Sequence, residues 1–319
     1  MSFTRLVGQS QAVELLMRAI AQNRIAPAYL FAGAAGVGRS LAAQCFAELL
    51  LIDRRTPLKQ AASPAASYST RIQQRNHPDL LWVEPTYLHQ GKRLSAAEAA
   101  ELGVKRRSPP EVRLEQIREV ARFLGRPPLE AARSVVVIEQ ADSMAEAAAN
   151  GLLKTLEEPG RATLILLATS AEVLLPTIVS RCQKIPFQRL SQAAIAQVLT
   201  QANYADLLQH PEVLALAEGS PGEAIAHWQQ LQAIPPDLLT AVLSPPNSLR
   251  SAMELARQVS QTLDAEAQLW LIDYLQQTYW KTHPRPEILQ LLENARRYLR
   301  QFVQPRLVWE VTLTELTEV

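Results

Sequence analysis

Residues 29–40 read Tyr29-Leu30-Phe31-Ala32-Gly33-Ala34-Ala35-Gly36-Val37-Gly38-Arg39-Ser40, and this stretch decides the fold. Its first four residues form an apolar run that is typical of a buried strand, and three glycines follow at once. A glycine-rich loop between a strand and a helix turns backbone N–H groups toward phosphate oxygens, and the helix N-terminus adds a partial positive charge. The glycine spacing alone also fits a simple turn. Its position directly after a strand favours a phosphate-binding loop in an α/β domain.

The loop departs from the usual nucleotide-binding pattern at Arg39, which stands where a lysine is expected. A guanidinium is bulky and planar, whereas a lysine ammonium is a compact charge. We therefore interpret Gly33, Gly36, Gly38, Arg39 and Ser40 as a degenerate nucleotide site, with Ser40 supplying a hydroxyl suited to magnesium. The residues leave open whether the loop binds ATP or ADP without hydrolysis or stays empty.

A second apolar strand, Ser134–Ile138, ends in Glu139 and Gln140, where a magnesium-site aspartate and a catalytic glutamate are expected. An amide does not accept a proton at neutral pH, so Gln140 cannot act as a general base. Some GTPases position water with a glutamine instead. Glu139 and Gln140 also fit plain hydrogen bonding at a strand end. A chain that keeps the scaffold and loses these groups is better suited to be the partner of an ATPase than an ATPase.

Arg181 follows the apolar segment 174–179 within Ser180-Arg181-Cys182. A single arginine at such a place is usually half of a surface ion pair. Whether Arg181 has a functional role therefore depends on the other motifs of the sequence.

Composition restricts the class of protein. The chain has 319 residues and a net charge of +1, which gives no polybasic signature for autonomous nucleic-acid binding. Lys105-Arg106-Arg107 is interpreted as a solvated loop. Two cysteines provide neither a disulfide framework nor a four-cysteine zinc site. The sequence lacks a signal peptide and a membrane helix, so a cytoplasmic protein without membrane contact is expected.

The pattern of elements predicts three domains. Residues 1–187 alternate helices and strands, which indicates a parallel sheet covered by helices. Insertions are predicted at 53–76 and 86–110, and a helix at 143–157 with Asp142 as its N-cap. Strand patterns fade after Phe187. Residues 188–233 are predicted to form a small helical lid domain and 234–319 a helical C-terminal domain, with a core stripe that includes Trp270, Tyr274, Tyr279 and Tyr298. Trp270, Tyr274 and Trp280 are expected in the core rather than at an interface.

The sequence resembles the clamp-loader members of the AAA+ superfamily. The resemblance covers most of residues 6–225 and rests on the glycine loop, Ser180-Arg181-Cys182 and four further motifs: Val7-Gly8-Gln9, His77-Pro78-Asp79-Leu80, Asn150–Pro159 and Gly219-Ser220-Pro221-Gly222. It implies an α/β, RecA-like AAA+ domain, a lid and an all-α collar. Glu223 stands where ATPase members carry an arginine that reaches the nucleotide. Family members often hold zinc through four cysteines after the first helix, and the absence of cysteine from residues 51–76 implies no zinc.

The resemblance implies a non-hydrolysing subunit of the clamp loader of bacterial DNA polymerase III, which loads the sliding clamp on primed DNA. It further implies that Arg181 acts in trans, as an arginine finger at a neighbour's ATP site. The implied partners are the gamma/tau and delta subunits, the sliding clamp, and primer-template DNA held through its backbone. No cofactor is required. Two alternatives stay open: an active AAA+ ATPase in which Arg39 replaces lysine and Gln140 positions water, and a non-catalytic AAA+ adaptor outside replication.

Overall fold

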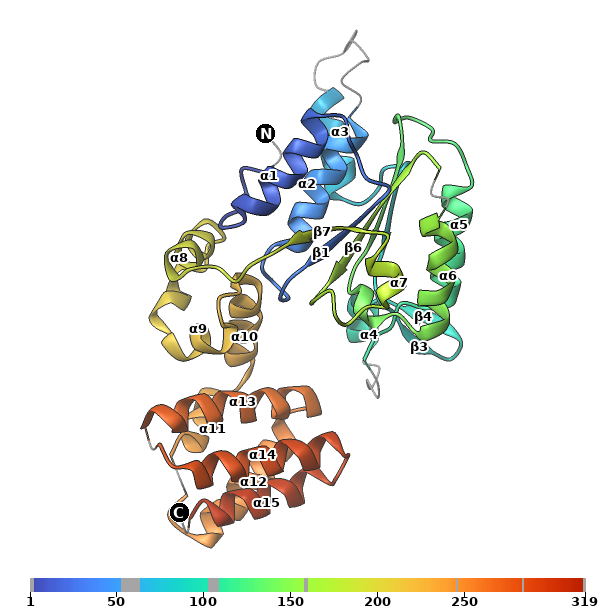
Figure 1. The fold of residues 1–319 in the computed structure, drawn as a ribbon. Coiled ribbons are helices and arrows are strands. Elements are labelled where there is room, and N and C mark those ends of the chain that lie inside the picture. Colours follow the sequence, from blue (N-terminus) through green and yellow to red (C-terminus); the bar gives the residue numbers. More distant parts are fainter. Residues whose placement is uncertain are drawn as a thin grey trace. The chain divides into compact units, whose positions relative to one another are not determined.

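The chain divides into two compact units, Met1–Leu190 and Ser191–Val319. The computed structural model describes residues 3–52, 64–102, 109–157, 160–244, 246–282 and 284–317. The first unit contains a parallel sheet covered by helices, and the described residues of the second form helices and turns only (Figure 1). The predicted boundaries after residues 187 and 233 stay predictions.

The sheet of the first unit has five parallel strands in the order β2-β5-β6-β1-β7. Strand β1 lies between β6 and β7, with Leu30 opposite Leu166 and Lys184. Every residue of β5 and β6 is buried, as expected for inner strands covered on both faces. The strands span Ala28–Ala32 (β1), Leu80–Val83 (β2), Ser134–Ile138 (β5), Ala162–Ala168 (β6) and Gln183–Pro186 (β7).

Side chains of β1 alternate between the two faces of the sheet. Tyr29 and Phe31 contact Phe46 of α2, and the Tyr29 and Phe46 ring centroids are 5.0 Å apart. Ala28 and Leu30 join the apolar core on the opposite face, which includes residues of α5 and α6. The helices of this unit are α1 (Ser10–Ala21), α2 (Arg39–Leu51), α3 (Pro64–Gln73), α4 (Ala96–Glu101), α5 (Leu114–Leu124), α6 (Glu146–Glu157) and α7 (Pro176–Val179), with a 3-10 turn, η1, at Ala141–Ser143.

The two predicted insertions contain regular structure. Helix α3 lies within the first, and residues 53–63 are outside the described residues. The second contains a hairpin of β3 (Tyr87–His89) and β4 (Lys92–Leu94), followed by α4. Lys105-Arg106-Arg107 also lies outside the described residues.

Proline sets the start of many helices in the second unit. A proline opens α9, α10, α11, α14 and α15, where its fixed φ suits the first helical turn and its missing N–H costs nothing. The helices are α8 (Gln192–Gln201), α9 (Pro211–Ala217), α10 (Pro221–Ala233), α11 (Pro236–Val242), α12 (Leu249–Thr262), α13 (Ala265–Thr282), α14 (Pro286–Arg300) and α15 (Pro305–Glu315), with a 3-10 turn, η2, at Ala205–Gln209.

Aromatic side chains form much of the core of the second unit. Trp270 is buried, stacks on Tyr274 with centroids 5.2 Å apart, and donates from Nε1 to His227. The Tyr279 hydroxyl donates to the Val242 carbonyl, and burial raises the pKa of Tyr279 to about 12. The core prediction is therefore confirmed for these three residues. It is wrong for Trp280 and Tyr298, which are 48% and 42% exposed because they lie on the outer faces of their helices.

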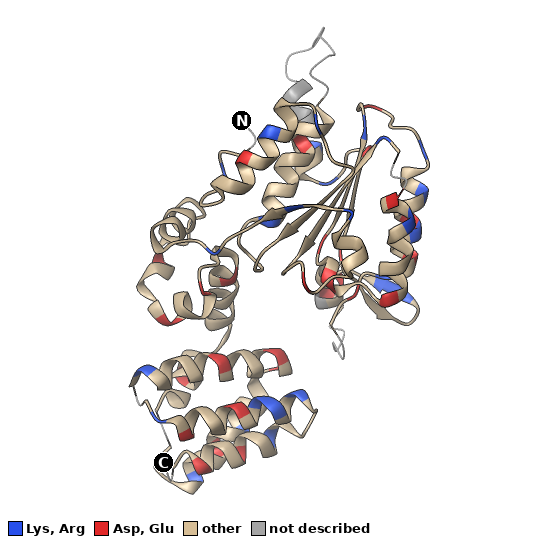
Figure 2. Cartoon of the chain, in the orientation of Figure 1, with Lys and Arg blue, Asp and Glu red and all other residues tan. Residues whose placement is uncertain are grey.

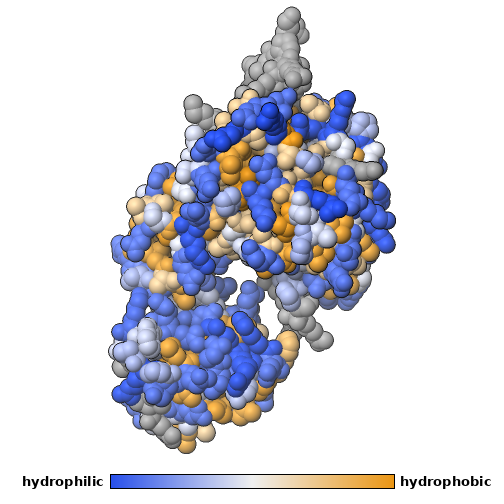
Figure 3. Space-filling model, in the orientation of Figure 1, coloured by the Kyte–Doolittle hydropathy of each residue, from blue (hydrophilic) through white to orange (hydrophobic). Residues whose placement is uncertain are grey.

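The surface carries charges of both signs, and basic and acidic residues are interspersed on both units (Figure 2). Hydrophilic residues predominate on the face drawn in Figure 3, with apolar residues in small patches. Exposed apolar residues of the second unit include Leu249 and Met253 of α12 and Leu307 and Val311 of α15. No helix among the described residues is long and apolar enough to cross a membrane.

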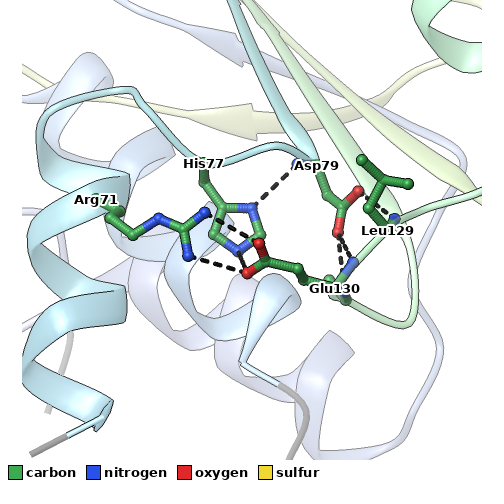
Figure 4. A network of polar contacts seen from close by, with 6 residues as sticks. Arg71, His77, Asp79, Leu129 and Glu130 are labelled. Atoms are coloured by element: carbon green, nitrogen blue, oxygen red, sulfur yellow. Dashed lines mark hydrogen bonds and ion pairs between the residues drawn. The ribbon is translucent and has the colours of Figure 1, made fainter.

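A buried carboxylate ties the start of β2 to the loop before β5 (Figure 4). Asp79 is 2% exposed and accepts backbone N–H bonds from Leu129, Glu130 and Ala131 at 2.6, 2.8 and 2.7 Å. Its own backbone N–H donates to Nδ1 of His77. The His77-Pro78-Asp79 motif therefore closes this loop against the sheet.

Replacing Asp79 with alanine should lower the free energy of unfolding by on the order of 3 kcal/mol, because it leaves three backbone donors without their acceptor. Urea unfolding followed by circular dichroism measures this change. The control is Glu115→Ala, which removes an exposed carboxylate from the first turn of α5 and should cost less than about 1 kcal/mol. Equal stability of the two variants contradicts the role given to Asp79.

Burial lowers the pKa of His77 below its ordinary 6.5, against the attraction of the Asp79 and Glu130 carboxylates. In the unfolded chain His77 takes up a proton as the pH falls through about 6.5, whereas in the folded chain it stays neutral to lower pH. The free energy of unfolding should therefore fall as the pH drops below about 6.5. His77→Gln, which does not titrate, should show a shallower fall in urea titrations at several pH values; an unchanged pH profile refutes this account.

Candidate nucleotide site and exposed arginine

The loop of residues 33–38 joins β1 to α2. Gly36 and Gly38 have φ angles of +69° and +104°, in the region that favours glycine. A Cβ on Gly33 would lie 2.4 Å from the carbonyl oxygen of Phe187, so this position admits no side chain. Ser40 is exposed in the first turn of α2. The glycines thus have the backbone form of a phosphate-binding loop, and their binding role stays a prediction.

Gln9 holds the loop in place from the N-terminus of α1. The side chain is 3% exposed, and its Nε2 donates to the carbonyl oxygens of Val37 at 3.2 Å and Gln188 at 2.7 Å. Its Oε1 accepts the backbone N–H of Gln188 at 3.0 Å. A single amide therefore joins the glycine loop to the chain that follows β7.

Arg39 is buried, although a charged side chain at this position of a phosphate loop is expected to face its ligand. It is 9% exposed, and its Nη1 has no hydrogen-bond partner. Burial lowers the pKa of Arg39, and the negative charges of Asp142 and then Glu139 act against that shift. The residue that follows the loop is therefore a buried guanidinium whose Nη1 donor is not hydrogen-bonded.

Asp142 lies in the 3-10 turn after β5 rather than at the start of a helix, and its negative charge acts against the lowered pKa of Arg39. Its Oδ2 accepts a hydrogen bond from Thr169 Oγ1 at 2.7 Å, and its Oδ1 is buried without a partner. The prediction of Asp142 as an N-cap was wrong, because residues 141–143 form a 3-10 turn and α6 begins only at Glu146. Neither Asp142 nor Thr169 was predicted from the sequence as a site residue. The signal for Thr169 was a hydroxyl directly after the buried strand β6.

Glu139 and Gln140 have different surroundings. Oε1 of Glu139 accepts from Trp82 Nε1 at 2.9 Å and from Arg75 Nη2 at 3.1 Å. The Arg75 guanidinium lies over the Trp82 ring, 4.3 Å from its centroid, and its Nη1 bonds to Glu84. Gln140 is exposed, with φ at +45°. The arrangement of Glu139 agrees with the alternative of hydrogen bonding at a strand end.

Arg181 lies in the turn between α7 and β7. Its Nη2 pairs with Oε1 of Glu157 at 2.9 Å, and its Nη1 donates to the Thr177 carbonyl at 3.0 Å. The Arg181 side chain is 38% exposed. Glu157 lies in α6 and Thr177 in α7, and neither contact involves the glycine loop. The charges of Asp142 and Glu139 thus act on the pKa of Arg39, whereas the contacts of Arg181 lie elsewhere on the first unit.

Glu223 belongs to the second unit, in the first turn of α10. Its backbone N–H donates to Oγ of the buried N-cap Ser220 at 3.2 Å. Across the described part of the chain, no group of three or more His, Cys, Asp or Glu side chains is placed to hold a metal ion.

Two known protein families match this chain, one over each of the two units. The family profile "DNA polymerase III, delta subunit" matches residues 8–191, and the profile "Cyanobacterial DNA polymerase III delta prime, C-terminal domain" matches residues 193–316. The chain belongs to the family of DNA polymerase III delta-prime subunits. The resemblance to clamp-loader proteins of the AAA+ superfamily is thereby confirmed.

Individual relatives agree with this assignment. The chain is 34% identical over 196 residues to DNA polymerase III subunit delta′ of Bacillus subtilis, which covers 60% of this chain and 51% of that protein. The delta′ subunit of Pseudomonas aeruginosa is 34% identical over 200 residues, covering 61% and 54%. The tau subunit of Bacillus subtilis is 28% identical over 243 residues, covering 74% and 39%. The chain thus spans about half the length, or less, of the curated relatives it matches.

A solved structure supports the fold. A gamma-subunit-related protein of DNA polymerase III from Thermotoga maritima superposes with a TM-score of 0.53 and 18% identity, covering 97% of this chain and 99% of that one. The predicted fold class, a parallel-sheet AAA+ domain followed by helices, is confirmed.

Replacing Gln9 with alanine should lower the free energy of unfolding by about 2 kcal/mol, because it removes the partner of the buried Val37 carbonyl and of the part-buried backbone groups of Gln188. Urea unfolding measures the change, and the exposed neighbour Gln11→Ala is the matched control. A Gln9→Ala protein as stable as the control shows that the amide does not hold the loop.

Proposed function

We propose that this delta-prime family chain is a non-hydrolysing subunit of a DNA polymerase III clamp loader that supplies Arg181 to the ATP site of a neighbouring subunit. The observation that carries the proposal is the contrast between two arginines. Arg39, in the chain's own glycine loop, is buried with its Nη1 donor unpaired, whereas Arg181 is held by two contacts at the surface.

The contacts of the chain's own site argue against hydrolysis there. The buried guanidinium of Arg39 lies near Asp142 and Glu139, and it lacks the compact shape of the usual lysine. Glu139 already accepts two hydrogen bonds on one oxygen, and Gln140 carries an amide that cannot act as a base. In this proposal the loop does not turn over any ATP or ADP that it takes up, and the function requires no cofactor and no zinc.

Arg181 has the features of an arginine that acts on a neighbour. The Thr177 carbonyl and the Glu157 carboxylate each engage one terminal nitrogen, which fixes the plane of the guanidinium. Because the side chain is partly exposed, it can reach a phosphate on another subunit. An arginine finger stabilises charge on the transferring phosphoryl group and contributes roughly 10³–10⁵ in rate.

The proposed assembly contains gamma/tau and delta subunits and acts in the cytoplasm on the sliding clamp and primer-template DNA. Relatives named as delta′ and tau subunits support these partners. The near-neutral charge of the chain fits scattered phosphate-backbone contacts within a complex rather than independent DNA binding. Residues 234–319 are proposed as the collar, and the exposed pairs Leu249–Met253 and Leu307–Val311 provide apolar area for subunit contacts.

The test is steady-state ATPase of the chain alone and of the clamp loader reconstituted with gamma/tau, delta, clamp and primed DNA. The chain alone should be inactive. Arg181→Ala should abolish turnover at one subunit interface and lower the DNA-stimulated rate of the complex, with assembly unchanged in gel filtration.

The matched control is Arg126→Ala, which removes an exposed arginine after α5 and should leave the rate unchanged. Undiminished DNA-stimulated turnover in the Arg181→Ala complex contradicts the proposal. Turnover by the isolated chain that Arg39→Ala removes favours the active-ATPase alternative.

A further inference from the structure

The C-terminal end of α14 carries a cluster of positive charge. Residues 294–306 hold four arginines and no carboxylate, although the net charge of the whole chain is +1. Arg296 and Arg306 are bonded to carboxylates. Arg297 and Arg300 are exposed and form no ion pair with any described residue. Two positive charges at this end of the helix are therefore available to a ligand.

The surface beside these arginines is hollowed. The hollow has a volume of about 290 Å³, and arginine and amide side chains form most of its lining: Arg296, Arg297, Arg300, Gln290, Asn294 and Gln301. The carboxylate that also lines it, Glu293, pairs with Arg296 and accepts from Gln276 Nε2, both at 3.3 Å. Guanidinium and amide N–H groups are the donors that proteins use to hold phosphate oxygens. The hollow therefore has the lining of a phosphate site.

Two exposed aromatic rings follow on the same helix end. Tyr298 and Phe302 are 42% and 81% exposed and lie one helical turn apart in sequence. The Arg297 guanidinium, which lines the hollow, lies 5.3 Å from the centroid of the Tyr298 ring. Single exposed apolar residues are ordinary on protein surfaces. Here Arg297 joins the positively charged hollow directly to an aromatic surface.

The backbone at Phe302 is unusual for a residue of this size. Its φ is +58°, in the left-handed region. Its N–H donates to the Leu299 carbonyl, and the N–H of Val303 donates to the Tyr298 carbonyl, both at 3.1 Å. This pair of bonds forms the helix ending at which glycine is usual, because a side chain is strained there. Neither the helix ending nor burial accounts for a phenylalanine at this position.

The helix end alone explains only part of this arrangement. Arginines in the last turn of a helix are stabilised by the negative end of the helix dipole, which accounts for Arg297 and Arg300 without any ligand. That explanation leaves the exposed rings of Tyr298 and Phe302 without a role. An acidic peptide would likewise need the charges and not the rings. Single-stranded nucleic acid uses both, because phosphates contact cations and unpaired bases stack on aromatic side chains.

We propose that the C-terminal end of α14 binds single-stranded nucleic acid, with Arg297 and Arg300 at the phosphates and Tyr298 and Phe302 stacked on the bases. The binding does not depend on base sequence, because every base offers a face for stacking. Two phosphate contacts in a chain of net charge +1 make it weak and dependent on salt. The proposal goes beyond the proposed function and does not involve Arg181, so either can fail alone.

The first experiment measures binding of the full chain to a labelled oligothymidylate of about 15 nucleotides by fluorescence anisotropy, starting at about 50 mM salt. Phe302→Leu keeps an apolar side chain and removes the ring, so it should weaken binding at least about fivefold with the salt dependence unchanged. Arg300→Ala should weaken binding and lower the slope of log K against log salt by about 0.7. Arg250→Ala, which removes an exposed arginine of α12, is the matched control and should change neither quantity.

A matched ligand separates stacking from charge. An abasic oligomer with the same number of phosphates should bind the wild-type chain at least about fivefold more weakly than oligothymidylate. Oligouridylate in the same assay distinguishes RNA from DNA as the preferred ligand. Equal binding of the abasic oligomer and oligothymidylate, or no binding of either, overturns the proposal.

Phe302→Gly tests the same residue without measuring activity. Glycine adopts the left-handed conformation without strain, so this variant should unfold at a higher urea concentration than the wild type while it binds oligothymidylate at least about fivefold more weakly. A lower unfolding midpoint would mean that the ring is a packing residue, which contradicts the proposal.

Photochemical crosslinking places the ligand on the chain. An oligonucleotide that contains 5-iododeoxyuridine should crosslink to Tyr298 or Phe302, as mapped by mass spectrometry. Crosslinks that lie only elsewhere overturn the proposal. If Phe302→Leu prevents assembly with gamma/tau and delta subunits and leaves oligothymidylate binding unchanged, the surface is a subunit contact and the proposal is wrong.

Discussion

Parallel pairing of the strands is the constraint on which the rest of the first unit depends. Strands β1, β6, β5 and β2 run in one direction, so their carboxyl ends meet at one edge of the sheet. Their interiors are mostly buried, and polar groups become possible only where each strand stops. The glycine loop, Thr169, Glu139 and Glu84 follow these four strands. The chemistry of this edge is therefore set by a few residues that can change without altering the sheet.

Three arginines show how differently one side chain is used along this chain. Arg39 is buried at the start of α2, Arg75 lies over an indole and pairs with two carboxylates, and Arg181 is held at the surface by a carbonyl and a carboxylate. A guanidinium suits all three settings because it is planar, stays charged and donates in several directions. A lysine would keep the charge in each place and lose the geometry.

The sequence predicted the elements whose signals are local. Strand β1 and the glycine loop follow from consecutive residues, and strand β5 was predicted at its observed bounds, Ser134–Ile138. The contacts of the site were not predictable in this way. Asp142 meets Thr169 because β5 and β6 are neighbours, and Arg75 meets Glu139 because β2 lies beside β5. The order of strands in a sheet does not follow from hydrophobic periodicity, so the sequence related Asp142 only to the helix predicted to follow it.

The close approach of Gly33 to Phe187 affects how a glycine at this position is interpreted in other sequences. A side chain at position 33 is excluded by a backbone carbonyl of the same chain, whatever the loop binds. This glycine is therefore required by the packing of the sheet, and a count of glycines scores the loop as intact whatever residues stand beside it. The residues beside the glycines therefore carry the information on what the loop binds, and Gly33 does not.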